Sequence, residues 1–508
     1  MDKTFEPADL RPTRPPGRTP PPHWRVNQTP VEHEVLRQQT LALLLHPYDP
    51  SSWIARAEIL SLLDFPELAV GDGYKAERLC KFMLDFISSR PSERWSLGSS
   101  KGFWMREDSD SQDNGQQDGT AKLRSSLGDL LNEARGVQES NLCNHPDRKG
   151  KYIPQAYPWL EARRRVRGQD VLDAITREIE TNKAKSPEGT PCVEVKRCSF
   201  LPAGEDLGES APLGVFATCD LPRGHRILTD RTDLFGCSGP GPDNSKSVLG
   251  GSFGCLHPLH PNLAHDESSH DLRWVRERAG QYAAEPLLIC RALLALVVST
   301  TSPQSQSPLD LPAIARLIPT YHRQLPRTFR LSTDIEIPNE ALQQFSIDIF
   351  ANPHYDSWVL FTLAARLQNN SWSSPVAAAL NPLFCMFNHS CEPNVEWQTR
   401  KDHRTIDLCL SRDVVAGEQL FVEYDAFMHD STLEVRRETL AHWIEGGCAC
   451  SRCVREERAA MAVLQSGDEK KKREFGGLSA AACHDDDDVV QRVSYFSLGI
   501  LVFLCTCL

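Results

Sequence analysis

The sequence lacks an N-terminal apolar segment of the kind that directs secretion. Residues 1–30 are charged and rich in proline, with the runs Pro15-Pro16 and Pro20-Pro21-Pro22. A signal peptide needs an apolar stretch of roughly 7–15 residues, so none is predicted here. The chain is therefore expected to be intracellular, in the nucleus or the cytoplasm. In a reducing compartment, clustered members of its 17 cysteines are considered as metal ligands before disulfides.

The sequence also lacks an excess of positive charge. It has 56 Lys and Arg against 68 Asp and Glu, for a net charge of -12. Binding to nucleic acid requires clustered basic residues that contact phosphates, so direct binding is not expected. A mildly acidic protein suits a basic partner better, such as a lysine-rich peptide.

Long apolar runs are missing except at the end of the sequence. Residues 493–508 read VSYFSLGILVFLCTCL. A membrane-spanning helix takes about 20 apolar residues, so this run is slightly short. A C-terminal anchor is one interpretation. A buried terminal segment or a wrongly predicted gene end are the alternatives, and they are preferred.

Composition and motif positions divide the 508 residues into seven segments. These are a disordered Pro-rich arm (1–30), a helical segment (31–90), a linker or disordered stretch (91–150), a helical lead-in (151–190), a mixed α+β domain with a helical insertion (191–427), a cysteine-bearing segment (428–457) and a tail with an apolar end (458–508). The mixed domain is predicted because short strand patterns, such as 192–195 and 419–423, flank helical patterns.

The helical segment has the spacing of large and small residues that is typical of a tetratricopeptide repeat. The positions concerned are Trp53, Ala57, Leu60, Ala69 and Ala76. One repeat cannot bury its own face, so it should pack on a neighbour and could bind a protein partner. An ordinary helical hairpin explains the same pattern, and both interpretations stay open.

Three cysteines stand close together in the cysteine-bearing segment, where residues 448–453 read CACSRC. Structural zinc is bound by four ligands in a tetrahedron, usually cysteine or histidine. The trio has no fourth cysteine nearby, so a ligand from a distant part of the chain is plausible. The alternative is that some of these cysteines are free thiols.

Several motifs occur together and in order. Residues 213–217 read LGVFA, 366–372 read RLQNNSW, 388–394 read NHSCEPN and 416–425 read AGEQLFVEYD, and the CACSRC run follows. In this order the motifs resemble those of SET-domain protein lysine methyltransferases. The likeness is closest to the SET-and-MYND type and to fungal proteins that join tetratricopeptide repeats to a SET domain.

The resemblance implies an α+β architecture, a β-rich SET fold in which the 388–394 segment and the 419–425 strand form a pseudoknot. It implies S-adenosylmethionine as cofactor and a lysine on a histone or another protein as substrate. Tyr424 would be the catalytic residue, and the segment 428–457 would be a post-SET zinc segment. The implied cofactor-binding residues are Gly214, Asn370, Asn388 and His389, and the implied zinc ligands are Cys391, Cys448, Cys450 and Cys453.

The sequence departs from the family pattern at three positions. Pro212 replaces the first glycine of a Gly-x-Gly loop, and Ile444 and Gly446 stand where relatives often have an aromatic pair. Trp443 or Trp397 could compensate. These departures leave open a second hypothesis, a catalytically inactive SET-fold protein that binds a peptide or partner. A third is a zinc-stabilised scaffold that binds no cofactor.

Overall fold

The computed structural model describes residues 30–465 with gaps. The residues left out within this range are 91–94, 98–103, 107–118, 144–149, 183, 199–211, 233, 238–271, 300–305, 318, 320–325, 374–376, 401–403, 426–427, 442 and 445–446. Residues 1–29 of the Pro-rich arm and the apolar run 493–508 lie outside the described residues. So do Cys255, His257, His260, His265 and His270, whose irregular spacing predicts a loop with incidental cysteine and histidine rather than a second zinc site. No helix of the described part is long and apolar enough to cross a membrane.

Four helices form the N-terminal part: α1 (Pro30–Leu45), α2 (Pro50–Leu62), α3 (Pro66–Ser88) and α4 (Gly119–Gln138). Helix α2 begins where Pro50 follows Asp49, whose side chain accepts a hydrogen bond from the Ser51 N–H. The buried faces of Trp53, Ala57 and Ala76 confirm helices that pack closely at these positions. They do not decide between a tetratricopeptide repeat and an ordinary hairpin, so the repeat stays a prediction.

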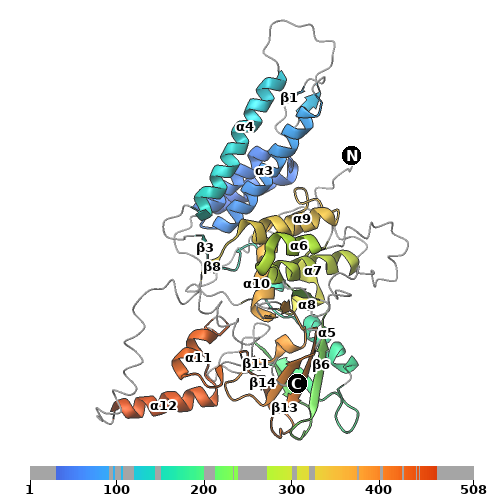
Figure 1. The fold of residues 1–508 in the computed structure, drawn as a ribbon, viewed down its shortest axis with the longest axis vertical. Helices are drawn as coiled ribbons and strands as arrows, with labels where there is room; N and C mark the ends of the chain where they lie inside the picture. Colours follow the sequence, from blue (N-terminus) through green and yellow to red (C-terminus); the bar gives the residue numbers. More distant parts are fainter. Residues whose placement is uncertain are drawn as a thin grey trace.

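The expectation of a linker over residues 91–150 is wrong for helix α4. Leu123, Leu127 and Ala134 are buried at helical spacing, and the first two pack on Met83 and Ile87 of α3. Figure 1 shows α4 running beside α3. The flanking polar stretch hides this apolar stripe when the composition of the whole segment is averaged. A short hairpin of β1 (Trp95–Leu97) and β2 (Trp104–Arg106) precedes the helix.

Small sheets make up the mixed domain. A four-stranded sheet has the order β11 (Asn388–His389), β14 (Gln419–Val422), β5 (Leu213–Ala217), β4 (Val193–Arg197). A second sheet has the order β12 (Val395–Thr399), β13 (Thr405–Leu410), β6 (Arg226–Arg231), and a third has β7 (Phe235–Cys237), β10 (Ala377–Ala379), β9 (Trp372–Ser373). Strands β3 (Lys151–Tyr152) and β8 (Arg327–Thr328) form a two-stranded pair.

The helical insertion lies between β7 and β9, as predicted. It contains α6 (Arg273–Ala279), α7 (Ala284–Ser299), α8 (Pro312–Ala315), α9 (Ile337–Gln344) and α10 (Ser357–Asn370). The lead-in contributes α5 (Gln169–Thr181), and the chain continues through α11 (Leu433–Leu440) and α12 (Ser451–Gln465). One large buried core joins residues of the sheets to the insertion. Helices α11 and α12 lie at the far end of the molecule from α3 and α4 (Figure 1).

Candidate active site and metal centre

Two segments that are distant in sequence meet at the centre of the site. Strand β11 pairs in parallel with β14, so that Asn388 lies opposite Phe421 and His389 opposite Val422. The Asn394 side chain strengthens this contact, because it accepts from the Phe421 N–H at 2.7 Å and donates to the Gln419 carbonyl at 2.9 Å. The pseudoknot prediction requires these two segments to be in contact, and they are.

Asn388 and Gly214, both predicted to bind cofactor, lie together. The Asn388 amide donates to the carbonyl of Leu213 at 2.9 Å. A Cβ atom on Gly214 would lie 3.1 Å from the Asn388 amide nitrogen and 2.5 Å from the Cys198 sulfur. It would also lie 2.5 Å from the Gln419 amide nitrogen, so any side chain at this position would force Cys198 and Gln419 to move. Pro212 takes part in the same strand pairing, because its carbonyl accepts from the Cys198 N–H at 2.8 Å.

His389 faces the opposite side of the strand from Asn388, since successive side chains of a β-strand point to opposite faces. Its ring is buried, with Nε2 3.2 Å from the Cys391 sulfur. Nδ1 accepts a hydrogen bond from the Tyr424 backbone N–H at 3.1 Å. Both ring nitrogens are thus used within the protein, so any contact of His389 with a cofactor would have to come from its backbone. Cofactor binding by His389 stays a prediction.

Tyr424 follows β14 and is partly buried. Its hydroxyl donates to the Phe387 carbonyl at 3.1 Å. The ring centroid lies 6.2 Å from Trp443 in an edge-on arrangement and 5.2 Å from His389. Burial raises the pKa of the Tyr424 hydroxyl above its usual value, so the group stays protonated at neutral pH. Trp443 is therefore an aromatic neighbour of Tyr424 despite the isoleucine at position 444.

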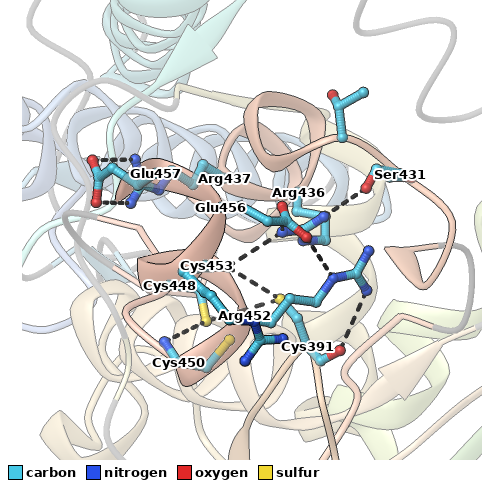
Figure 2. A network of polar contacts seen from close by, with 12 residues as sticks. Cys391, Ser431, Arg436, Arg437, Cys448, Cys450, Arg452, Cys453, Glu456 and Glu457 are labelled. Atoms are coloured by element: carbon cyan, nitrogen blue, oxygen red, sulfur yellow. Dashed lines mark hydrogen bonds and ion pairs between the residues drawn. The ribbon is translucent and has the colours of Figure 1, made fainter. Parts of the chain in front are cut away.

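The four predicted zinc ligands come together although Cys391 is far from the trio in sequence. The sulfurs of Cys391, Cys448, Cys450 and Cys453 all lie within 4.8 Å of one another. Cys391 is 4.0 Å from Cys448 and 3.6 Å from Cys453. Zn–S bonds of about 2.3 Å in a tetrahedron require S–S separations of about 3.8 Å, so the cluster fits this ion. Figure 2 shows the four side chains converging.

The electrostatics of the cluster also suit a cation. The hydrogen bond between Cys391 and Cys448 lowers the pKa of the Cys448 thiol and raises that of Cys391; burial raises the pKa of Cys453, and the hydrogen bond from Arg436 opposes that increase. Arg436, whose side chain is fully buried, brings Nη2 to 3.6 Å from the Cys453 sulfur and pairs with Glu456 (Figure 2). A guanidinium at this distance stabilises thiolates, the form that binds metal.

The remaining predicted residues have other surroundings. Asn370 is the last residue of α10, and its amide donates to the Arg366 carbonyl of the same helix at 2.7 Å. Its role in cofactor binding stays a prediction. Ile444 packs against the cysteine cluster. Gly446 lies outside the described residues. Trp397 donates to the Glu423 carbonyl at 3.0 Å.

Some residues of the site were not found from the sequence. Cys198 accepts from both the Asn388 and Gln419 amides, at 3.7 and 3.5 Å. Arg436 lies on α11, more than forty residues from Cys391. Neither residue belongs to a motif, so no signal in the sequence alone pointed to them. The signal for Asn394 was present, because it ends the NHSCEPN run, but nothing in the run indicates its partners.

The comparisons with known proteins agree with this geometry. Residues 213–425 match the family model for the SET domain. This region, which contains Gly214, Asn388, His389, Cys391 and Tyr424, is a SET domain.

Individual relatives match over a shorter stretch. The histone-lysine N-methyltransferase SET5 of Yarrowia lipolytica is 40% identical over 77 residues, 15% of this chain and 17% of the relative. A SET and MYND domain-containing protein of Dictyostelium discoideum is 34% identical over 71 residues, 14% of this chain and 13% of the relative. The chain thus spans less than a fifth of the length of these relatives.

Among solved structures, the SET domain of LSMT bound to lysine and AdoHcy aligns with 54% of this chain and 56% of that chain. The identity is 13% and the TM-score 0.30. A likeness at this level supports no further conclusion.

Proposed function

We propose that this protein is an S-adenosylmethionine-dependent protein-lysine N-methyltransferase. The observation that carries the proposal is the junction of β11 and β14 in the SET domain, which brings Asn388 beside Gly214 and holds Tyr424 by its backbone and its hydroxyl. One relative named as a histone-lysine methyltransferase, SET5 of Yarrowia lipolytica, matches 77 residues of the chain at 40% identity.

Methyl transfer to a lysine amine depends more on holding the reactants in position than on acid–base catalysis. Methyl transfer is an in-line displacement at a sulfonium carbon by a neutral amine, whereas free lysine has a pKa of about 10.4. A desolvated channel favours the neutral amine, and fixed orientation of the reactants lowers the barrier. Tyr424 suits this task, because its protonated hydroxyl is held in one place by the Phe387 carbonyl. Its oxygen would orient the amine and stabilise the methyl group as positive charge develops.

Zinc would have a structural role. Cys391, Cys448, Cys450 and Cys453 would supply all four ligands, as in closed structural sites, which leave no position for a substrate. Because Cys391 follows β11 and the trio begins beyond α11, the ion would fasten the C-terminal helices α11 and α12 to the sheet that carries the active site. The substrate would be a lysine-bearing protein, histone or otherwise, within the cell.

Calorimetric titration of the full-length protein with S-adenosylhomocysteine tests the cofactor site. We expect saturable binding, and its absence would end the enzyme hypothesis.

Transfer of a labelled methyl group to lysine-rich proteins then tests catalysis. Tyr424→Phe should lower kcat by roughly 100-fold, because one transition-state contact is removed, and should leave cofactor affinity unchanged. The exposed Tyr282→Phe is the matched control. Cofactor binding without transfer by the wild type would favour the inactive, partner-binding hypothesis.

A further inference from the structure

His389 lies between the cysteine cluster and Tyr424 and contacts both. Its Nδ1 accepts from the Tyr424 N–H at 3.1 Å, and its Nε2 lies 3.2 Å from the Cys391 sulfur. An imidazole nitrogen that accepts a hydrogen bond carries no proton, so the proton of the neutral ring is on Nε2. The ring therefore directs its Nε2–H at the cysteine cluster, 3.2 Å from the Cys391 sulfur and also in contact with Cys448, while Nδ1 holds the backbone of Tyr424.

The rest of Tyr424 is fastened to the same short segment. Its hydroxyl donates to the carbonyl of Phe387, two residues before His389. The Ser390 N–H donates to the Val422 carbonyl, two residues before Tyr424, at 3.0 Å. Residues 387–390 thus make three hydrogen bonds to Tyr424 or its strand. The one contact among these that also reaches the sulfur cluster is the His389 ring.

We propose that His389 is a positioning residue that links the metal centre to Tyr424. A metal ion bound at the cluster makes Cys391 a thiolate, and a thiolate accepts hydrogen bonds more strongly than a thiol. The strengthened bond to Nε2–H fixes the ring, and the fixed ring holds the Tyr424 N–H. Metal binding therefore orders the catalytic residue as well as the C-terminal helices. The consequence for methyl transfer rests on the proposed function, whereas the linkage between cluster, ring and backbone does not.

Two substitutions separate the two contacts of the ring. His389→Asn places an amide oxygen near the position of Nδ1, so it keeps an acceptor for the Tyr424 N–H and loses the donor to Cys391. His389→Gln places an amide nitrogen near the position of Nε2, so it keeps the donor and loses the acceptor. Arg436→Gln is the matched control, because Arg436 also donates to a sulfur of the cluster, Cys453, but has no hydrogen bond to Tyr424.

The first measurement concerns the metal contact. Zinc release from the full-length protein to a competing chelator should be roughly 10- to 100-fold faster in His389→Asn than in wild type, and near wild type in His389→Gln. In the cobalt-substituted protein, the sulfur-to-cobalt absorption band should shift in His389→Asn but not in His389→Gln. Unchanged release and an unchanged band in a folded His389→Asn protein would overturn the proposal.

The second measurement concerns the backbone contact, read by hydrogen exchange of the peptide that contains Tyr424. In zinc-loaded protein its amide should exchange about tenfold faster in His389→Gln than in wild type, because one hydrogen bond is lost. Removing zinc should speed this exchange in wild type and in Arg436→Gln. It should add little in His389→Gln, and a full additional increase there would overturn the linkage. Neither measurement uses cofactor or turnover. Failure to bind S-adenosylhomocysteine would therefore refute the proposed function, whereas the link through His389 would still be decided by zinc release and hydrogen exchange.

Discussion

Two buried polar clusters in this protein are completed in different ways. At the interface of α2, α3 and α10, Arg56 pairs with Asp72 and with Asp356 at 2.6 and 2.9 Å, and Lys75 lies 3.5 Å from Asp356. Two positive and two negative side chains balance one another, and the Trp53 ring lies against both cations. This cluster, which we call the charge cluster, needs nothing from outside the chain.

The cysteine cluster differs from the charge cluster. It lies where the segment after β11 meets the chain around α11 and α12. Four sulfurs converge there, while the surrounding donors are Arg436 and His389. Four thiolates would carry more negative charge than the Arg436 guanidinium balances, so a divalent cation is the natural complement. Both clusters fasten helices to the mixed domain, but only the second should make that attachment depend on a ligand.

The cysteine cluster should depend on a bound metal, whereas the charge cluster should not. Loss of that metal is the largest effect expected. Cys450→Ser removes one of four ligands, so bound zinc should fall from about one ion per chain to near zero. Elemental analysis of the purified protein measures this. Proteolysis should at the same time become faster around α11 and α12. Serine substitution of Cys80, which is buried within α3, is the control and should keep the metal. Unchanged zinc in Cys450→Ser would refute the assigned site.

Breaking the charge cluster should have the next largest effect. Burial opposes ionisation of Asp356, but the charges of Arg56 and Lys75 outweigh it and lower its pKa. Asp356→Asn leaves these cations without full compensation and should cost about 3–5 kcal/mol of unfolding free energy. Denaturant unfolding measures the loss, which a chelator should not alter. The exposed pair of Arg37 and Glu34 gives the control Glu34→Gln, for which no measurable loss is expected.

Glu67, a buried carboxyl five residues before Asp72, can be compared with the aspartates of the charge cluster. Its carboxyl accepts a hydrogen bond from the Tyr157 hydroxyl rather than from a cation. Burial raises its pKa from 4.5 to about 7. Since the folded value is above the unfolded one, the stability that Glu67 contributes is complete below about pH 4.5 and is lost as the pH rises through about 7.

The substitution Glu67→Gln removes the ionisable carboxyl and therefore the loss of stability at high pH. It keeps a side-chain oxygen that can accept the hydrogen bond from the Tyr157 hydroxyl. The variant should be more stable than wild type by roughly 3 kcal/mol at pH 8, and the difference should vanish near pH 4. Thermal unfolding across this pH range is the measurement, with the exposed Glu188→Gln as control. A difference between Glu67→Gln and wild type that does not change with pH would contradict the explanation.

The two clusters also differ in how far the sequence revealed them. The cysteine trio is visible because three ligands fall within six residues, and the resemblance to the SET family supplied Cys391. The charge cluster has no such signal, since Arg56 and Asp356 are separated by 300 residues. Helix α4 was missed for a related reason, because its buried leucines stand in a segment whose average composition is polar.

The sequence by itself determined the elements whose chemistry is local: the SET motifs, the cysteine trio and the insertion of helices between strands. Those features depend on residue type and short spacing, which a linear pattern contains. Tertiary structure decided which side of β11 each side chain occupies. Because neighbouring residues of a strand face opposite ways, Asn388 lies beside Gly214 while His389 lies between Cys391 and Tyr424. The two residues are adjacent in the NHSCEPN motif. In the folded chain, where β11 pairs with β14, their side chains have different neighbours and therefore different roles.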